Sequence, residues 1–115
     1  KQLPKGFSYL SGDDHTTLVR LFGGADGVIS VCANVVPDTM QAMCQHADAH
    51  TWQEAKALHA KLQPYFAAMS LGGNPAVIKY LAAKKWQFPY RLRAPLESLP
   101  GAVLEKINTL INDTA

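Results

Sequence analysis

A strand–helix–strand pattern near the start of the chain most constrains its fold. Residues 7–10 are typical of a short strand, and the unbroken run from Gly27 to Val31 is typical of a second one. Apolar residues at helical spacing lie between them: Leu18, Leu21 and Phe22. Strands joined by a helical crossover run parallel and form a right-handed unit. We therefore predict a βαβ unit whose second strand is buried, as apolar parallel strands are.

Four further helices are predicted downstream. Pro37 suits the first turn of one helix, and the capping box Thr51–Glu54 begins the next. Asn74-Pro75 is expected to cap a third helix. A Pro-rich extended segment from 88 to 99 follows, and the last helix is marked by four apolar residues: Val103, Ile107, Leu110 and Ile111.

This inventory contains too few strands for an independent sheet. Parallel sheets are stable when several strands share the ladder and both faces are covered. Only 17% of the 115 residues are charged, against about 25% in typical soluble domains. We therefore expect a segment of a larger α/β fold, with part of its surface covered by something else.

Composition and charge exclude several classes of partner. The 11 Lys and Arg against 9 Asp and Glu leave a net charge of +2 without a long basic tract, so we expect no nucleic acid and no anionic membrane surface as a partner. The apolar stretch from Gly27 to Val36 is about half the length that spans a bilayer. The two cysteines, Cys32 and Cys44, are interpreted as reduced thiols of a cytoplasmic protein.

Chemistry in α/β folds lies at the carboxyl ends of the strands. Here these ends are followed by Ser11–Asp14 and by 31–34. Asp13 and Asp14 are interpreted chiefly as helix-capping residues, the alternative being contact with a substrate amine or hydroxyl. Ser11, Asp14 and His15 could be combined into a catalytic triad, but the chain has no Gly-x-Ser-x-Gly nucleophile elbow.

Two other groups of side chains are candidate sites. Cys44, His46 and His50 could share a helical face as metal ligands, but the Glu of a zinc-protease motif is missing, and a solvated surface is the favoured interpretation. Three lysines, Lys79, Lys84 and Lys85, fall on a predicted helix. None follows a strand end, which is where a Schiff-base lysine with apolar surroundings would be expected. We predict no metal and no cofactor.

At these motifs the chain resembles the dihydrodipicolinate synthases, in the N-acetylneuraminate lyase superfamily of (β/α)8 aldolases. The resemblance rests on 7–14 and 23–37, and five shorter matches follow in order: Met40, Met43-Cys44, Asn74-Pro75, Lys79 and 91–96. It implies an α/β fold, the C-terminal part of a TIM barrel. Residues 1–50 would be its last two βα units, and residues 51–115 a C-terminal helical region of the same domain.

The resemblance also implies a function. The family condenses pyruvate with aspartate semialdehyde in lysine and diaminopimelate biosynthesis, through a Schiff base on a lysine. Ile29 matches the position whose main chain lines the pyruvate site, and Gly12 and Asp13 match the rim where the second substrate enters. The Schiff-base lysine, the proton-relay tyrosine, the carboxylate-binding arginine and the paired threonines would all precede Lys1, so no catalytic residue is expected within this chain, and the chain alone is expected to be inactive.

Departures from the family pattern keep an alternative open. The run 74–79 lacks a second proline, Ala94 replaces a larger apolar residue, and 71–73 stands where an acidic residue is usual. A naturally truncated, non-catalytic relative could act as an oligomerisation or interaction module. Expected partners are therefore pyruvate and aspartate semialdehyde in the complete enzyme, and a homo-oligomer or the missing barrel strands. A metal-binding domain is the third, weaker alternative.

Overall fold

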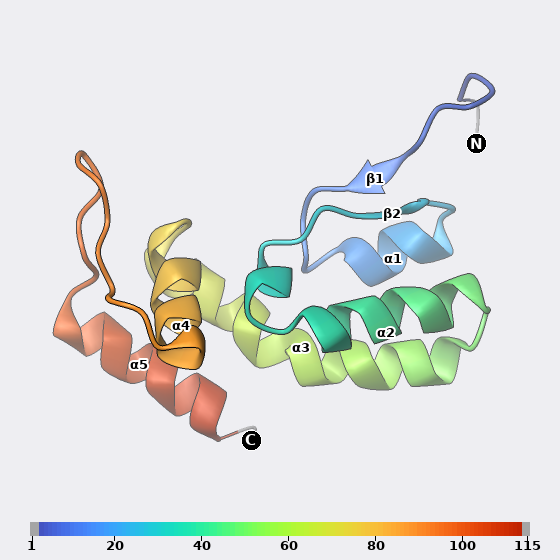
Figure 1. Ribbon diagram of the computed structural model, residues 1–115. Helices are drawn as coiled ribbons and strands as arrows, with labels where there is room; N and C mark the ends of the chain where they lie inside the picture. The colour runs from blue at the N-terminus through green and yellow to red at the C-terminus, as the bar shows by residue number, and fades with distance from the viewer. Residues whose placement is uncertain (1–2, 114–115) are drawn as a thin grey trace. The chain divides into compact units, whose positions relative to one another are not determined.

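The computed structural model describes residues 3–113, which fold as two compact units (Figure 1). The first unit runs to Leu62, and the second begins at Gln63. The division falls inside one long helix, next to Pro64, whose ring nitrogen cannot donate a helical hydrogen bond. The boundary expected after residue 50 stays a prediction.

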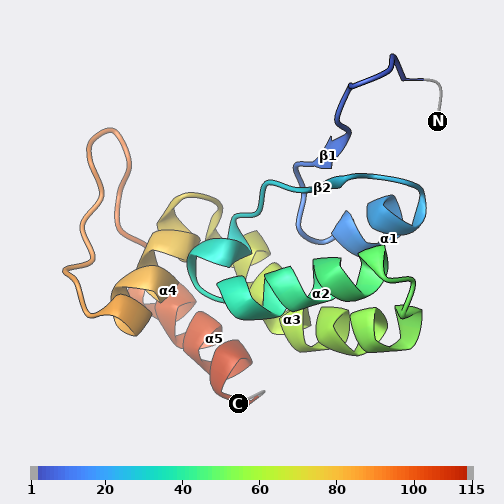
Figure 2. The same ribbon diagram turned by 45° about the vertical axis from the view of Figure 1, so that its right-hand side comes forward.

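The first unit opens with the predicted strand–helix–strand pattern. Strand β1 (Leu10–Ser11), helix α1 (Thr17–Phe22) and strand β2 (Gly27–Val28) follow in that order, and Figures 1 and 2 show α1 beside both strands. The strands are parallel, with Leu10 opposite Gly27 and Ser11 opposite Val28. The parallel βαβ unit is confirmed, although both strands are shorter than predicted.

The predicted burial of the second strand is wrong for this chain. The side chain of Ile29, directly after β2, is 71% exposed, and Val28 is half-buried. A parallel strand is buried when neighbouring strands and helices cover it on both sides. The sheet of the described residues has two strands. The apolar run 27–31 therefore lacks the further strands that would bury it in a larger sheet.

Three helical segments complete the first unit: the short 3-10 helix η1 (Cys32–Asn34), α2 (Pro37–Asp48) and the first part of α3 (Trp52–Gly72). Pro37 stands in the first turn of α2 as predicted. In a capping box the Thr51 hydroxyl would accept from the N–H of Glu54. In the structure it donates to the main-chain carbonyl of His46 over 3.0 Å. Seven buried side chains form the core: Cys32, Val35, Met40, Met43, Ala47, Ala55 and Leu62.

The second unit consists of the end of α3, helix α4 (Ala76–Trp86), an extended loop and helix α5 (Gly101–Asn112). Its buried apolar side chains come from all three helices: Phe66, Ala68, Ala76, Val77, Ile78, Leu81, Ala83 and Ile107. Asn74 does not cap α4, which has Pro75 at its N-cap without a side-chain bond. The loop leaves α4 and returns to α5 (orange in Figure 1). None of the helices within 3–113 has the length and hydropathy to cross a membrane.

Candidate functional site

The carboxyl ends of β1 and β2 bring two loops to one edge of the sheet. Beyond the paired residues, the N–H of Ile29 donates to the carbonyl of Ser11 over 2.9 Å. The loop from Gly12 to Thr16 therefore begins beside the segment that leads from β2 into η1. This edge is where parallel α/β folds hold their reactive and binding groups.

Two buried hydroxyls hydrogen-bond to the main chain of the loop 12–16. Ser11 and Thr17 are both fully buried, with their hydroxyl oxygens 3.0 Å apart. Both hydroxyls lie within donor distance of the carbonyl of Asp13, at 3.0 Å and 2.8 Å. The Ser11 hydroxyl is thus a structural group without access to a substrate, and the structure does not support the triad of Ser11, Asp14 and His15.

We call this edge, formed by residues 12–16 and 29–32, the rim. Gly12 and Asp13 lie exposed there. A side chain at Gly12 would point into open space. One carboxylate oxygen of Asp13 accepts from the N–H and the hydroxyl of Thr16, over 3.2 Å and 2.7 Å. The bond from the Thr16 side chain, aided by the charges of His15 and Arg20, lowers the pKa of Asp13. Asp13 is therefore an accessible, charged group that a substrate cation could approach.

The capping interpretation of the paired aspartates is correct only in part. Helix α1 begins at Thr17 and has no acidic residue in its first turn. Asp13 caps the turn before the helix, through Thr16. Asp14 points elsewhere, because its Oδ2 accepts the main-chain N–H of Cys32 over 2.8 Å. This bond joins the loop after β1 to the start of η1.

Sequence reasoning missed the bond between Asp14 and Cys32. The two residues are 18 positions apart, and only the parallel register brings them together. The sequence does contain a signal for this bond. An acidic residue follows one parallel strand, and a helix begins just after the next strand. The first N–H groups of a helix have no acceptor within it, so they are natural partners for that carboxylate. Cys32 itself is fully buried, and burial, with the charge of Asp14, raises the pKa of its thiol.

The candidate metal ligands Cys44, His46 and His50 are not assembled into a site. Nδ1 of His46 lies 2.8 Å from the Thr51 hydroxyl, and the His50 ring lies 5.9 Å from that of Trp52. Cys44 and His50 do border one open hollow of about 340 Å³. Across residues 3–113, however, no three His, Cys, Asp or Glu side chains are placed to hold a metal ion.

The lysines on α4 belong to the second unit, and Lys79 is half-buried there. Lys84 donates to the side-chain oxygen of Asn108 over 2.7 Å, and the ammonium of Lys85 lies 5.0 Å from the ring centroid of Trp86. Both side chains are exposed. Neither side chain lies in the apolar enclosure in which a Schiff-base lysine acts.

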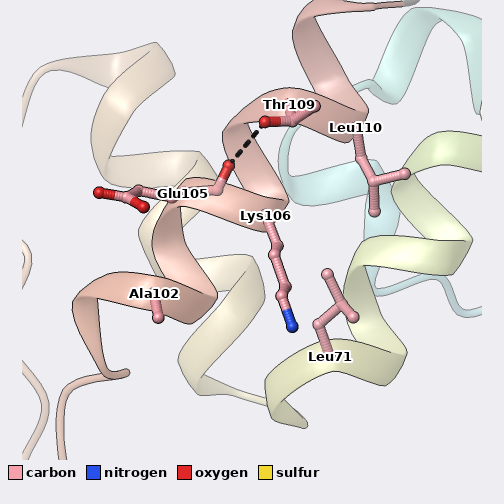
Figure 3. Close-up of a pocket in the computed structure, with 6 residues that line it drawn as sticks. All are labelled: Leu71, Ala102, Glu105, Lys106, Thr109 and Leu110. Carbon is pink, nitrogen blue, oxygen red and sulfur yellow. Dashed lines mark hydrogen bonds between the residues drawn. The ribbon is translucent and has the colours of Figure 1, made fainter.

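The second unit carries an open pocket of about 560 Å³ that the sequence did not indicate (Figure 3). It lies between the end of α3 and the outer face of α5, and six residues line it: Leu71, Ala102, Glu105, Lys106, Thr109 and Leu110. Its Thr109 hydroxyl donates to the Glu105 carbonyl over 3.1 Å, within the helix. In Figure 3 the side chain of Lys106 extends toward Leu71, and that of Glu105 points away. The pocket therefore brings no set of polar groups to one point.

Comparison with known proteins identifies the fold to which these elements belong. The 4-hydroxy-tetrahydrodipicolinate synthase of Maridesulfovibrio salexigens is 40% identical over 107 residues, which are 93% of this chain and 37% of the relative. The structure of the synthase from Methylacidiphilum fumariolicum SolV superimposes with a TM-score of 0.90 at 38% identity, covering 97% of this chain and 37% of that one.

A third comparison includes a ligand. The chloride-inhibited dihydrodipicolinate synthase of Acinetobacter baumannii, complexed with pyruvate, superimposes with a TM-score of 0.87 at 30% identity, over 94% of this chain and 37% of its own. The chain thus spans less than two fifths of the length of the relatives it matches, and its fold is part of the synthase TIM barrel. Because the sequence pattern of the Dihydrodipicolinate synthetase family matches residues 1–114, the chain belongs to this family.

Proposed function

We propose that the chain supplies the last two βα units and the C-terminal helical region of a dihydrodipicolinate synthase-like Schiff-base lyase. The reaction would join pyruvate to aspartate semialdehyde in lysine and diaminopimelate biosynthesis. The observation that carries the proposal is the parallel βαβ unit whose two strand ends form one bonded rim, in a chain that matches the family over 1–114. Both cysteines are free thiols, which suits the expected cytoplasmic location.

The rim offers groups suited to both substrates. The main chain at Ile29 is held against β1 by its bond to Ser11 and would line the pyruvate site. Gly12 leaves open space at the rim, where the second substrate would enter. Asp13 carries a carboxylate whose lowered pKa keeps it charged at neutral pH, which suits the ammonium group of an amino-acid aldehyde.

The covalent step needs an amine that the rim does not provide. An imine forms when a lysine amine attacks the keto carbon of pyruvate and water leaves. The residues following β1 and β2, 12–16 and 29–31, include no lysine. Incubating the 115-residue chain with pyruvate and borohydride should therefore leave its intact mass unchanged. A stable pyruvyl adduct on this chain would overturn the proposal.

A chimera tests the positive part of the proposal. The matched segment of the Maridesulfovibrio salexigens relative, 107 residues at 40% identity, would be replaced by this chain. The chimera should be trapped by pyruvate and borohydride, and it should condense pyruvate with aspartate semialdehyde. A chimera that has the circular dichroism and oligomeric state of the relative but takes up no pyruvate would contradict the proposal.

A second candidate function, an oligomerisation or interaction module, is favoured by the exposed apolar side chains of the first unit. Val19 and Phe22 on α1 and Ile29 after β2 are each more than 70% exposed. Apolar surface of this kind marks contact with another chain or segment. Sedimentation of the 115-residue chain at micromolar concentration distinguishes the two functions, since a discrete dimer would support the module and a folded monomer would argue against it.

A further inference from the structure

We infer that Asp14 is a positioning residue for the pyruvate site: its carboxylate fixes the main chain that runs from Ile29 to Cys32. This inference rests on the proposed function, which assigns the main chain at Ile29 to that site. It separates the roles of the two adjacent aspartates, with Asp13 facing the substrate and Asp14 acting through the backbone.

Two hydrogen bonds donated by main-chain N–H groups hold the segment at its ends. At the first end, the N–H of Ile29 donates to the carbonyl of Ser11 over 2.9 Å. At the second end, the N–H of Cys32 donates to Asp14 Oδ2 over 2.8 Å. Both acceptors belong to β1 and the turn that follows it. Both ends of the segment are therefore bonded to β1 and its turn, and loss of Asp14 would remove the bond at the second end.

The surroundings of Asp14 favour a positioning role over contact with a substrate. Its Oδ2 is engaged by Cys32, and its Oδ1 is buried with no hydrogen-bond partner in the described part of the chain. A carboxylate oxygen in that position is shielded from any ligand at the rim. The exposed Asp13, by contrast, has its carboxylate at the surface.

A charged acceptor suits the start of η1. Cys32 is the first residue of this helix, so its N–H has no acceptor within the helix and needs one outside it. Hydrogen bonds from a backbone N–H to a carboxylate are stronger than those to a neutral oxygen. The neighbouring Cys32 thiol is buried and stays protonated, so it places no second negative charge against Asp14.

The first experiment measures the bond itself in the 115-residue chain. In the 15N-labelled protein, Asp14→Ala should raise the hydrogen-exchange rate of the Cys32 amide on the order of tenfold, because the carboxylate acceptor is lost. The adjacent variant Asp13→Asn is the matched control and should leave that rate unchanged. A Cys32 amide that exchanges at its original rate in Asp14→Ala, with the amides of α2 still protected, would overturn the inference.

A conservative variant covers the case in which Asp14→Ala unfolds. Asp14→Asn keeps a neutral oxygen acceptor, so it should stay folded and shift the Cys32 amide resonance, with exchange between those of the original chain and the alanine variant. An unmoved Cys32 resonance in folded Asp14→Asn would overturn the inference as well.

The second experiment measures the effect on the site, in the chimera with the Maridesulfovibrio salexigens relative. Asp14→Ala should raise the KM for pyruvate on the order of tenfold through misplacement of the main chain, while the KM for aspartate semialdehyde stays the same. Asp14→Asn should recover most of the loss. Asp38→Asn, an exposed change in the first turn of α2, is the matched control.

The outcomes separate this inference from the proposed function. A chimera that forms no pyruvate adduct even with Asp14 intact would contradict the proposed function, whatever the exchange rates show. A chimera that forms the adduct, and whose pyruvate KM is unchanged by Asp14→Ala, would contradict the positioning role alone. Equal increases in the pyruvate KM in Asp14→Asn and Asp14→Ala, with the Cys32 amide still protected in Asp14→Asn, would show that the charge acts otherwise than through this bond, which also contradicts the positioning role.

Discussion

Removing the two buried hydroxyls beneath the first loop should destabilise the first unit in a non-additive way. Ser11 Oγ, Thr17 Oγ1 and the carbonyl oxygen of Asp13 form a triangle with sides of 2.8 to 3.0 Å. Two hydroxyl protons can make two hydrogen bonds at a time, so one of the three short separations is always without a proton. Either hydroxyl alone can therefore still donate to the Asp13 carbonyl.

The expected magnitudes follow from that count. Ser11→Ala or Thr17→Val removes one hydroxyl proton and one of the two hydrogen bonds that the triangle can hold, which costs about 1 kcal/mol. Ser11→Ala also removes the long bond that the Asp13 N–H donates to the Ser11 hydroxyl over 3.4 Å. The double variant removes both and leaves the carbonyl of Asp13 with the Thr16 hydroxyl at 3.5 Å. An unsatisfied carbonyl costs about 1–3 kcal/mol, and the low end applies because this site is only partly buried. We expect the double variant to lose about 1 kcal/mol more than the sum of the single variants.

Urea unfolding followed by tryptophan fluorescence measures these free energies. Trp52 lies in the first unit, with its ring centroid 5.0 Å from that of Phe22, so its emission reports the unfolding of that unit. The second tryptophan, Trp86, is removed in all variants by Trp86→Phe. Losses that add to within about 0.3 kcal/mol would refute the proton count, and so would a double variant more stable than either single variant.

Three further predictions concern buried or half-buried groups of the first unit. Met43→Ala should lower its free energy of unfolding by about 2–5 kcal/mol, measured by urea titration, because Met43 is fully buried. Iodoacetamide should leave Cys32 unlabelled in the native chain and label it in urea, as mass spectrometry would show, because burial raises the pKa of its thiol. Burial, then the charge of His15, lowers the pKa of His59. As the pH falls, the unfolded chain therefore binds a proton at His59 before the folded chain does. The contribution of His59 to the free energy of unfolding is complete above about pH 6.5 and is lost as the pH falls through the lowered pKa of the folded state. This pH dependence of the urea midpoint should be absent in His59→Gln.

Features determined by short stretches of sequence were predictable. The start of α2 at Pro37 follows from the fixed φ of proline and its missing N–H. The order of strand, helix and strand follows from the change in apolar spacing along residues 7–31. The parallel direction of β1 and β2 then follows from the crossover alone.

Features that depend on distant neighbours were not predictable. The partner of Asp14 is 18 residues away, and its acidic neighbour Asp13 has the same local sequence signals but bonds within its own turn. The Thr51 hydroxyl likewise bonds back to His46 across the turn between α2 and α3, although its sequence matches a capping box. In each case two bonding patterns are compatible with the local sequence, and the tertiary arrangement selects one.

The exposure of Ile29 and the bonding of the rim have different origins. A run of apolar residues reports the surroundings of a strand in a complete sheet, and the described sheet has two strands, so Ile29 remains 71% exposed. The bonds that shape the rim, from Ile29 to Ser11 and from Cys32 to Asp14, join residues of the first unit only. Both bonds that hold the rim main chain are therefore made without the neighbours that would bury Ile29. Within the proposed function, further strands would cover the apolar faces and bring the reactive amine to a rim that the first unit has already shaped.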